Sequence, residues 1–261
     1  MGFRYAPATM AAHKPPSANM PARDNKSYYD EFSSWYERHR HRGYHTFIDQ
    51  LEADAVLRHA TPDSRVLEAG CGTGLILRRL AERVRLAVGL DLSAGMLRRA
   101  HERKLPVVQA SVTNVPFADE SFDLVCSFKV LAHVEPIHDA LAELGRVLRP
   151  GGRLVAEFYN TRSLRYLIKR VKRPSAISQK TNDEAVYTRY DNLERIRGYL
   201  PAGLTIESVR GVRVLTPVSH VHDIPVVGAA LRRAETHAAD HRVLGSFGGF
   251  LVVTAKKAGA A

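Results

Sequence analysis

Three glycines are clustered in the stretch VLEAGCGTGLIL, residues 66–77. Gly70, Gly72 and Gly74 stand between an apolar run typical of a strand and another typical of a helix. Because glycine has no Cβ atom, such a loop can turn tightly and bring its backbone close to a ligand. The first strand-to-helix loop of a parallel sheet commonly contacts the ligand. The G-x-G-x-G spacing lacks the G-x-G-x-x-G of dinucleotide sites, so an ordinary turn is the alternative.

An acidic residue, Asp91, ends the next apolar run, in VGLDLS. It follows the glycine loop by about 20 residues. In nucleotide-binding α/β folds, the carboxylate that accepts the ribose hydroxyls stands at this separation along the sequence. The loop and Asp91 together favour a cofactor that contains a nucleoside. The alternative is that Asp91 caps the helix that follows, but Ser93 can take that role.

The elements that position these residues alternate between strand and helix. Strands are predicted at residues 65–70, 86–92, 106–110, 122–128, 152–159, 203–215 and 248–257. Helices are predicted at 74–83, at 93–103 with Ser93 as N-cap, at 137–148 and at 190–199. Strands that are apolar on both faces and alternate with helices indicate a mostly parallel sheet with helices on both faces. We therefore expect an α/β fold, a Rossmann-like three-layer sandwich with a seven-stranded sheet.

The chain is divided by composition. Residues 1–25 are rich in Pro, Ala and Ser and are expected to be a disordered tail. Residues 26–60 carry an aromatic cluster and then an amphipathic helix, and are expected to form an N-terminal helical lid. Simple packing of the aromatic stripe on the core is the alternative. Residues 61–160 form the predicted cofactor-binding core, and 161–261 complete it with two insertions, 161–190 and 216–247, which are expected to shape an acceptor pocket.

Charge and cysteine content restrict the partners and the compartment. The 261 residues include 38 Lys and Arg against 27 Asp and Glu, a formal net charge of +11. Nucleic acid or an anionic membrane surface would suit this charge. The arginines are scattered over all the predicted helices, however, which favours a solvated basic surface. Two cysteines, Cys71 and Cys126, cannot build a disulfide framework. A cytoplasmic protein is expected.

Four motifs in this order resemble those of the class I S-adenosylmethionine-dependent methyltransferases, in particular the methyltransferase type 11 subgroup. They are VLEAGCGTG, VGLDLSAGML, VPFADESFDLVCS and LRPGGRLV, within residues 65–160. This resemblance implies S-adenosylmethionine as cofactor, S-adenosylhomocysteine as product and a lid over the cofactor. No metal is expected, because Lys129 and Ala132 stand where metal-dependent quinone O-methyltransferases have acidic residues. Signatures of quinone C-methylases are not apparent.

The resemblance also assigns residues to the cofactor. Glu68 and the glycine loop would face its methionine end, Asp91 its ribose, and Leu92 or Met96 its adenine. The family usually has an aspartate at position 111, so Ser111 is a departure that leaves the backbone of Val112 for the adenine. The full predicted cofactor set is Tyr28, Tyr36, Glu68, Gly70, Cys71, Gly72, Gly74, Asp91, Leu92, Met96, Ser111, Val112 and Phe128. Within it, Cys71 is expected to be a small loop residue rather than a nucleophile.

Methyl transfer from a sulfonium is an in-line displacement in which the protein chiefly aligns the two reactants and excludes water. A base is needed only for a weakly acidic hydroxyl or a protonated amine. His133, just after the fourth predicted strand, is the candidate base, and a packing role is its alternative. His45 is a second candidate. His220, His222 and Asp223 have the chemistry of metal ligands but lack a further partner cluster.

These features predict a methyltransferase whose acceptor is a small molecule with a hydroxyl, amine or carbon nucleophile. No RNA-binding module is recognisable. An RNA, phospholipid or quinone head-group acceptor is the alternative within the same class of enzyme. A regulator that binds S-adenosylmethionine without chemistry is the rival from another class. The oligomeric state does not follow from the sequence.

Overall fold

One seven-stranded sheet forms the centre of the protein. The computed structural model describes residues 25–33, 36–37, 40, 43–163, 166–167, 187–216 and 219–259. In chain order the strands are β1 (Arg65–Ala69), β2 (Leu86–Asp91), β3 (Val107–Gln109), β4 (Phe122–Ser127), β5 (Leu148–Tyr159), β6 (Leu204–Val212) and β7 (Phe250–Lys257). Their order in the sheet is β3-β2-β1-β4-β5-β7-β6. The first five strands are mutually parallel, and β7 runs antiparallel to both of its neighbours.

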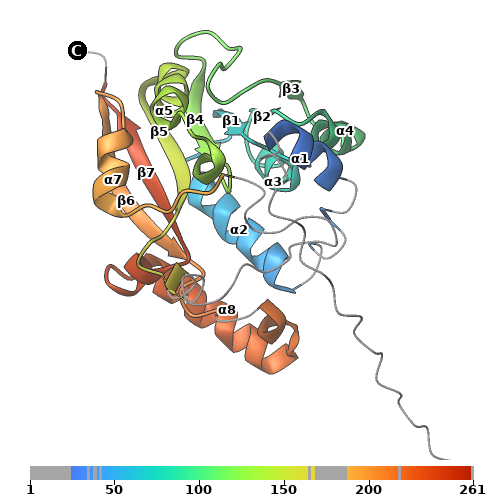
Figure 1. Ribbon diagram of the computed structural model, residues 1–261, viewed down its shortest axis with the longest axis vertical. Helices are drawn as coiled ribbons and strands as arrows, with labels where there is room; N and C mark the ends of the chain where they lie inside the picture. Colours follow the sequence, from blue (N-terminus) through green and yellow to red (C-terminus); the bar gives the residue numbers. More distant parts are fainter. Residues whose placement is uncertain are drawn as a thin grey trace, which may run out of the picture.

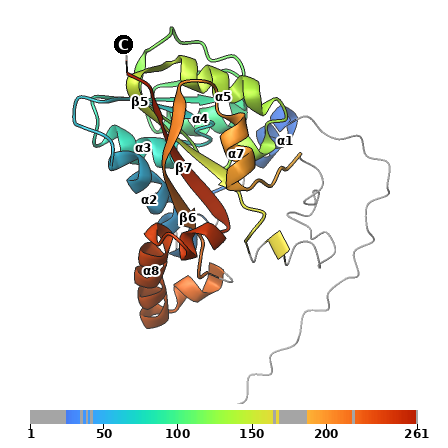
Figure 2. The same cartoon turned by 90° about the vertical axis from the view of Figure 1, so that its left-hand side faces the viewer.

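Helices cover both faces of the sheet. One face carries α2 (Gly43–Leu57), α3 (Leu75–Ala81) and α4 (Ala94–Glu102), and the other carries α5 (Ile137–Arg146) and α7 (Leu193–Tyr199). Figure 2 shows α2 and α3 on one side of the strands and α5 and α7 on the other. Successive side chains of a strand point to opposite faces, so Val66 enters one core and Leu67 the other. The expected three-layer, Rossmann-like α/β fold is confirmed.

The sheet order reverses between β1 and β4. From β1 the chain moves outward to β2 and β3, and it then returns to place β4 on the other side of β1. The carboxyl ends of β1 and β4 lie side by side, with Glu68 paired in register with Cys126. In open α/β sheets a ligand crevice forms at this type of switch point. The loops that follow β1, β2 and β4 therefore border one space.

The predicted junction between the helix at 137–148 and the strand that follows it is shifted in the structure. The helix predicted at 137–148 ends at Arg146, and the strand predicted from residue 152 already begins at Leu148. Leu148 pairs with Phe122, and the register then shifts before Arg153 pairs with Leu124. Gly151 has φ of 78°, a left-handed conformation that suits glycine. The RPGG segment is thus an irregularity within β5, rather than a turn that precedes it.

The remaining described elements lie at the ends of the core. Figure 1 shows α1 (Asn25–Phe32) beside α4, and the two helices are in contact. Between β6 and β7 the chain forms the 3-10 turns η2 (Ser219–Asp223) and η3 (Leu244–Phe247) and the helix α8 (Pro225–Asp240), which packs on β6 and α2. No helix in the described part of the chain is long and apolar enough to cross a membrane.

Several sequence predictions lie outside the described residues. These are the tail up to residue 24 and most of the 161–190 insertion. Of the predicted lid, α2 is built into the main core, with Ile48, Leu51 and Val56 buried against the sheet. The cavities described below are bordered by Tyr29 of α1, by Tyr36 and Arg40, which follow it, and by Asp49 of α2.

Candidate active site

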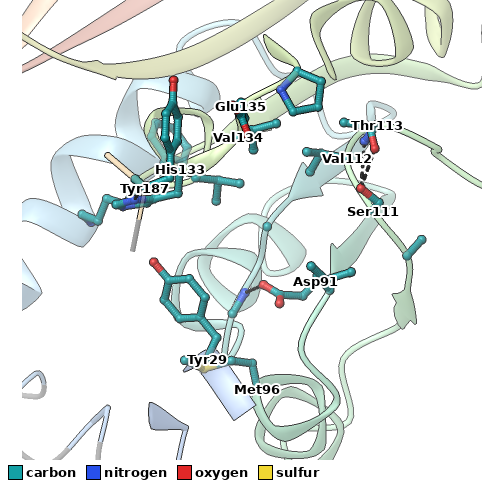
Figure 3. Close-up of a pocket in the computed structure, with 18 of the residues that line it drawn as sticks. Tyr29, Asp91, Met96, Ser111, Val112, Thr113, His133, Val134, Glu135 and Tyr187 are labelled. Carbon is teal, nitrogen blue, oxygen red and sulfur yellow. Dashed lines mark hydrogen bonds between the residues drawn. The ribbon is translucent and has the colours of Figure 1, made fainter. Parts of the chain in front are cut away.

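A cavity of about 550 Å³ lies at the carboxyl ends of the parallel strands. Figure 3 shows Tyr29, Asp91 and Met96 along one side and His133, Val134 and Glu135 along the opposite side. The predicted site residues that line it are Tyr36, Gly70, Gly72, Asp91, Leu92, Met96, Ser111, Val112, Phe128 and His133. The volume is within the usual range of small-molecule and cofactor sites.

A second cavity, of about 40 Å³, adjoins the first, and the two share Tyr36, Gly70, Gly72, Phe128 and Lys129. Its wall includes the glycine-loop residues Cys71 and Thr73 and four ionisable side chains, Arg40, Asp49, Glu68 and Lys129. In this wall the Arg40 Nε, Glu68 Oε2 and Thr73 Oγ1 atoms are buried without a hydrogen-bond partner among the described residues. Buried polar atoms are normally hydrogen-bonded, so these atoms indicate a polar ligand.

The glycine loop is shaped by steric limits that differ along its length. Gly70, Gly72 and Gly74 all have positive φ. A Cβ atom on Gly70 would stand 2.1 Å from Cγ2 of Val130, and one on Gly74 would stand 2.5 Å from Cδ1 of Leu105. A Cβ atom on Gly72 would meet nothing within 4 Å. Gly70 and Gly74 are therefore required by packing, whereas Gly72 faces open space next to the cavities.

Asp91 links the ends of β1 and β2. Its Oδ2 accepts a 2.8 Å hydrogen bond from the Gly72 backbone N–H, and its Oδ1 accepts a 2.9 Å bond from the Ser93 N–H. A carboxylate offers about four lone-pair positions, so these bonds leave part of its acceptor capacity unused. Burial raises the pKa of Asp91, although the backbone N–H donors oppose this shift. The carboxylate is thus held in place by the chain at the wall of the larger cavity.

Ser93 caps α4, as the sequence predicts. Its Oγ accepts a 3.1 Å hydrogen bond from the Met96 N–H at the first turn of the helix. The capping role is therefore taken by Ser93, which leaves Asp91 for the cavity.

At the other end of the cavity, Ser111 Oγ lies 2.7 Å from Thr113 Oγ1 and accepts a 3.2 Å bond from the Thr113 N–H. Figure 3 shows this pair beside Val112.

His133 lies in the 3-10 turn η1 (Leu131–His133) that follows β4. Its Nδ1 is 2.8 Å from the backbone carbonyl oxygen of Tyr187 and 3.3 Å from Thr188 Oγ1. Because a carbonyl can only accept, this contact places the ring hydrogen on Nδ1 and leaves the lone pair on Nε2. Nε2 lies 3.4 Å from the Tyr159 hydroxyl. The neutral ring is therefore oriented with its basic nitrogen defined.

Of the two tyrosines predicted at the cofactor, one lines the cavities and the other does not. Tyr36 lines both cavities, whereas Tyr28 lines neither and is buried, stacked on Phe32. Tyr29 lines the larger cavity instead, and Figure 3 shows its hydroxyl directed into it. Successive residues of a helix point about 100° apart, so a prediction that is one residue off selects another face.

Other candidate residues are placed away from the cavities. His45 is half-buried on α2 with its ring against Tyr44, and it lines neither cavity. Burial, together with the charge of nearby Arg40, lowers its pKa. His222 is buried between Tyr44 and Phe47, and its Nε2 lies 3.0 Å from Thr216 Oγ1. Within the described ranges no three His, Cys, Asp or Glu side chains converge on a possible metal position.

Cys71 lines the smaller cavity and is buried, and Gly74 begins α3 as its N-cap without lining either cavity. Burial, with a further contribution from Glu68, raises the pKa of the Cys71 thiol far above its usual range. The thiol is therefore protonated at neutral pH, which is unfavourable for a nucleophile.

Sequence reasoning missed the charged residues around the smaller cavity, apart from the glycine-loop neighbour Glu68. Lys129 donates to Glu52 Oε2 at 2.6 Å and lies 3.5 Å from Asp49 Oδ1, and Arg40 donates to the same Asp49 oxygen at 2.7 Å. Asp49 and Glu52 are buried polar residues on the core-facing side of α2. Acidic residues at apolar positions of an amphipathic helix were the available signal.

Comparisons with known proteins agree with this geometry. Residues 67–156 match a methyltransferase domain family. A demethylmenaquinone methyltransferase from Corynebacterium urealyticum is 40% identical over 98 residues, which are 37% of this chain and 43% of that protein. One from Mycobacterium sp. strain KMS is 37% identical over 134 residues, 48% of this chain and 58% of that protein. The chain thus spans about half the length of these curated relatives.

Solved structures extend the likeness of fold over most of the chain. An S-adenosylmethionine-dependent methyltransferase from Thermotoga maritima has a TM-score of 0.61 and 21% identity, covering 89% of this chain and 99% of that one. Another from Mesorhizobium loti has a TM-score of 0.57 and 22% identity, covering 80% and 98%. Residues 67–156 thus form a methyltransferase domain, and the chain as a whole has the fold of the class I S-adenosylmethionine-dependent methyltransferases.

Proposed function

We propose that the chain transfers the methyl group of S-adenosylmethionine to a small-molecule acceptor. The observation that carries this proposal is the pair of adjoining cavities. The smaller cavity is lined by several ionisable side chains, and the larger one by Asp91 together with apolar residues. A zwitterionic methionine end suits the smaller cavity, where Arg40 and Lys129 are opposed by Asp49 and Glu68. The rest of the cofactor suits the larger cavity.

Each part of the cofactor has a counterpart in the chain. Arg40 Nε, Glu68 Oε2 and Thr73 Oγ1 are buried atoms that a zwitterion would supply with partners. Asp91 lines the larger cavity with a carboxylate that can accept hydrogen bonds from the ribose hydroxyls. Leu92, Met96 and Val112 offer apolar contact for the adenine. These residues therefore fit the cofactor that the family implies.

When bound, the cofactor supplies an activated methyl group on a sulfonium sulfur. The chain contributes alignment of the acceptor and exclusion of water by the lid. In the displacement, the electron pair of the acceptor forms the bond to the methyl carbon, while the carbon–sulfur pair stays on sulfur in S-adenosylhomocysteine. His133 Nε2 is the group proposed to take the acceptor proton, with Tyr187 and Thr188 holding the ring in place.

The names of the curated relatives favour a reduced quinone among the acceptor classes. A hydroquinone hydroxyl is weakly acidic, so a base that removes its proton would activate either the oxygen or a ring carbon for methylation. His133, a neutral histidine in the wall of the larger cavity, suits that task. An aromatic alcohol or an amine is served by the same base.

The test is mass spectrometry after incubation with S-adenosylmethionine that carries a trideuterated methyl group. The panel contains a reduced naphthoquinone, simple phenols, amines, an RNA and anionic vesicles. Label in a small molecule, with a matching amount of S-adenosylhomocysteine, is the expected result. Label only in RNA or lipid would contradict the acceptor class. Binding of the cofactor without turnover of any acceptor would favour a regulator.

A further inference from the structure

Six ionisable side chains are packed together beneath the smaller cavity. Arg40 is paired with Asp49, and Lys129 is paired with Glu52, at 2.7 and 2.6 Å respectively. Glu52 is fully buried, and the side chain of Lys129 is 23% exposed. In these two pairs each cation is matched by one carboxylate.

The cluster contains two more carboxyl groups than cations. Glu157 of β5 is buried and lies in the electrostatic surroundings of Glu52 and Lys129, and neighbouring buried carboxyl groups disfavour each other's ionisation, so one of the two is favoured to hold a proton. Glu68 of β1 is 3% exposed, and its Oε2 has no hydrogen-bond partner among the described residues. A buried carboxylate without a counter-ion is strongly disfavoured and takes up a proton instead. Charge counting thus makes Glu68 a neutral carboxylic acid.

The groups that face Glu68 do not supply a compensating cation. Burial is the main reason that the pKa of Glu68 lies well above its usual value, and Glu52, Asp49 and Asp91 raise it further, while Lys129 lowers it. Lys129 is already engaged by Glu52, and Arg40 by Asp49. The titratable and charged groups around Glu68 are Arg40 from the lid, Asp49 and Glu52 from α2, Cys71, Asp91, Cys126, Lys129 and Glu157.

A ligand that brings its own positive charge would change this balance. Glu68 lines the smaller cavity together with Gly70 and Gly72, on the side where the proposed function places the methionine end of the cofactor. That end carries an ammonium group, which is a cation at neutral pH. A carboxylate beside an ammonium group is favoured over a carboxylic acid beside it.

The geometry points to a proton exchange at Glu68: entry of the ammonium group into the smaller cavity displaces the Glu68 proton to solvent, so that cofactor binding releases one proton. This inference rests on the proposed function. No bond other than the O–H bond of Glu68 is broken, and the ammonium keeps its three hydrogens. Protons therefore compete with the cofactor, and the affinity decreases as the pH falls.

The test is calorimetric titration of the full chain with S-adenosylhomocysteine at one pH in three buffers of different ionisation enthalpy. The expected result is the release of about one proton per ligand, and an affinity that falls about tenfold for each pH unit toward acid. 5′-Methylthioadenosine, which has the same nucleoside but no amino-acid end, is the matched ligand and is expected to release none. This comparison needs no variant.

A variant then locates the proton. Glu68→Gln keeps the shape and is expected to bind S-adenosylhomocysteine more weakly with no proton released, whereas Glu82→Gln, an exposed change on the surface, is expected to behave as the wild type. The inference is overturned if the wild type releases no proton, if both ligands release equally, or if Glu68→Gln still releases one. In each of these results S-adenosylhomocysteine binds and the proposed cofactor stands. Absence of any binding would instead contradict the proposed function as well.

Discussion

The carboxylate of Asp30 on α1 accepts a 2.6 Å hydrogen bond from the hydroxyl of Ser93, the residue that caps α4. The same Oδ1 atom accepts a 2.9 Å bond from the Gly95 N–H. Ser93 also donates its backbone N–H to Asp91, which borders the larger cavity. Ser93 therefore connects α1 to the carboxylate of Asp91.

Asp30→Ala is expected to loosen the lid. Hydrogen bonds to a charged group contribute about 1.5 to 3 kcal/mol each, and partial exposure of Asp30 places the effect at the lower end of this range. The dissociation rate of S-adenosylhomocysteine should rise about tenfold, measured by stopped-flow fluorescence. Asp30→Asn keeps an acceptor oxygen, so its dissociation rate should lie between that of the wild type and that of Asp30→Ala. An unchanged rate in Asp30→Ala would show that this contact does not hold the lid.

Gly70→Ala and Gly72→Ala form a matched pair. At Gly70 the new methyl group would overlap Val130, so we expect a loss of about 2 kcal/mol or more in the free energy of unfolding. At Gly72 the space is open, so only the positive φ opposes the change, at about 1 kcal/mol. Urea denaturation measures both. Equal losses would contradict this division of the loop between packing and the cavity.

His133→Ala is expected to reduce kcat about 100-fold while leaving the affinity for S-adenosylhomocysteine unchanged. Tyr159→Phe removes only the hydroxyl 3.4 Å from Nε2 and should have a smaller effect. A decrease of less than about tenfold in His133→Ala would assign the ring to packing rather than to catalysis.

Lys129→Met leaves the buried Glu52 without its cation. A buried charge that loses its partner costs about 3 kcal/mol or more. Burial already raises the pKa of Glu52, and Lys129 opposes that shift, so removal of Lys129 raises the pKa further. Glu52 of the variant is therefore ionised only at higher pH, and the loss of stability should be larger at pH 8 than at pH 5.5.

The double variant Lys129→Met with Glu52→Gln separates charge from packing. It removes both members of the pair, so most of the stability lost in Lys129→Met should return. The difference between the stability losses at pH 8 and pH 5.5 should disappear. Urea denaturation at the two pH values gives both quantities. A double variant as unstable as Lys129→Met would show that the lysine contributes through contacts other than its charge.

Local patterns were sufficient to predict the order of strands and helices in the core, the glycine loop after β1 and the position of Asp91 at the end of β2. These features follow from the hydrophobic periodicity of a segment and from the position where a strand ends. Both depend on residues that are adjacent in the sequence. The pairing of Lys129 with Glu52 joins residues far apart in the chain, and it depends on how α2 crosses the sheet. The exchange of Tyr28 for Tyr29 at the cavity has a simpler reason, since the rotation of a short helix about its axis is not set by its sequence alone.

The last strand in chain order, β7, lies between β5 and β6 and is the sole sheet partner of β6 among the described strands. On a ribosome, β1 to β5 can pair as they emerge, but β6 has no edge to join until β7 has been made. Assembly of the cofactor side can thus precede that of the C-terminal side, whose two strands are added to the sheet together.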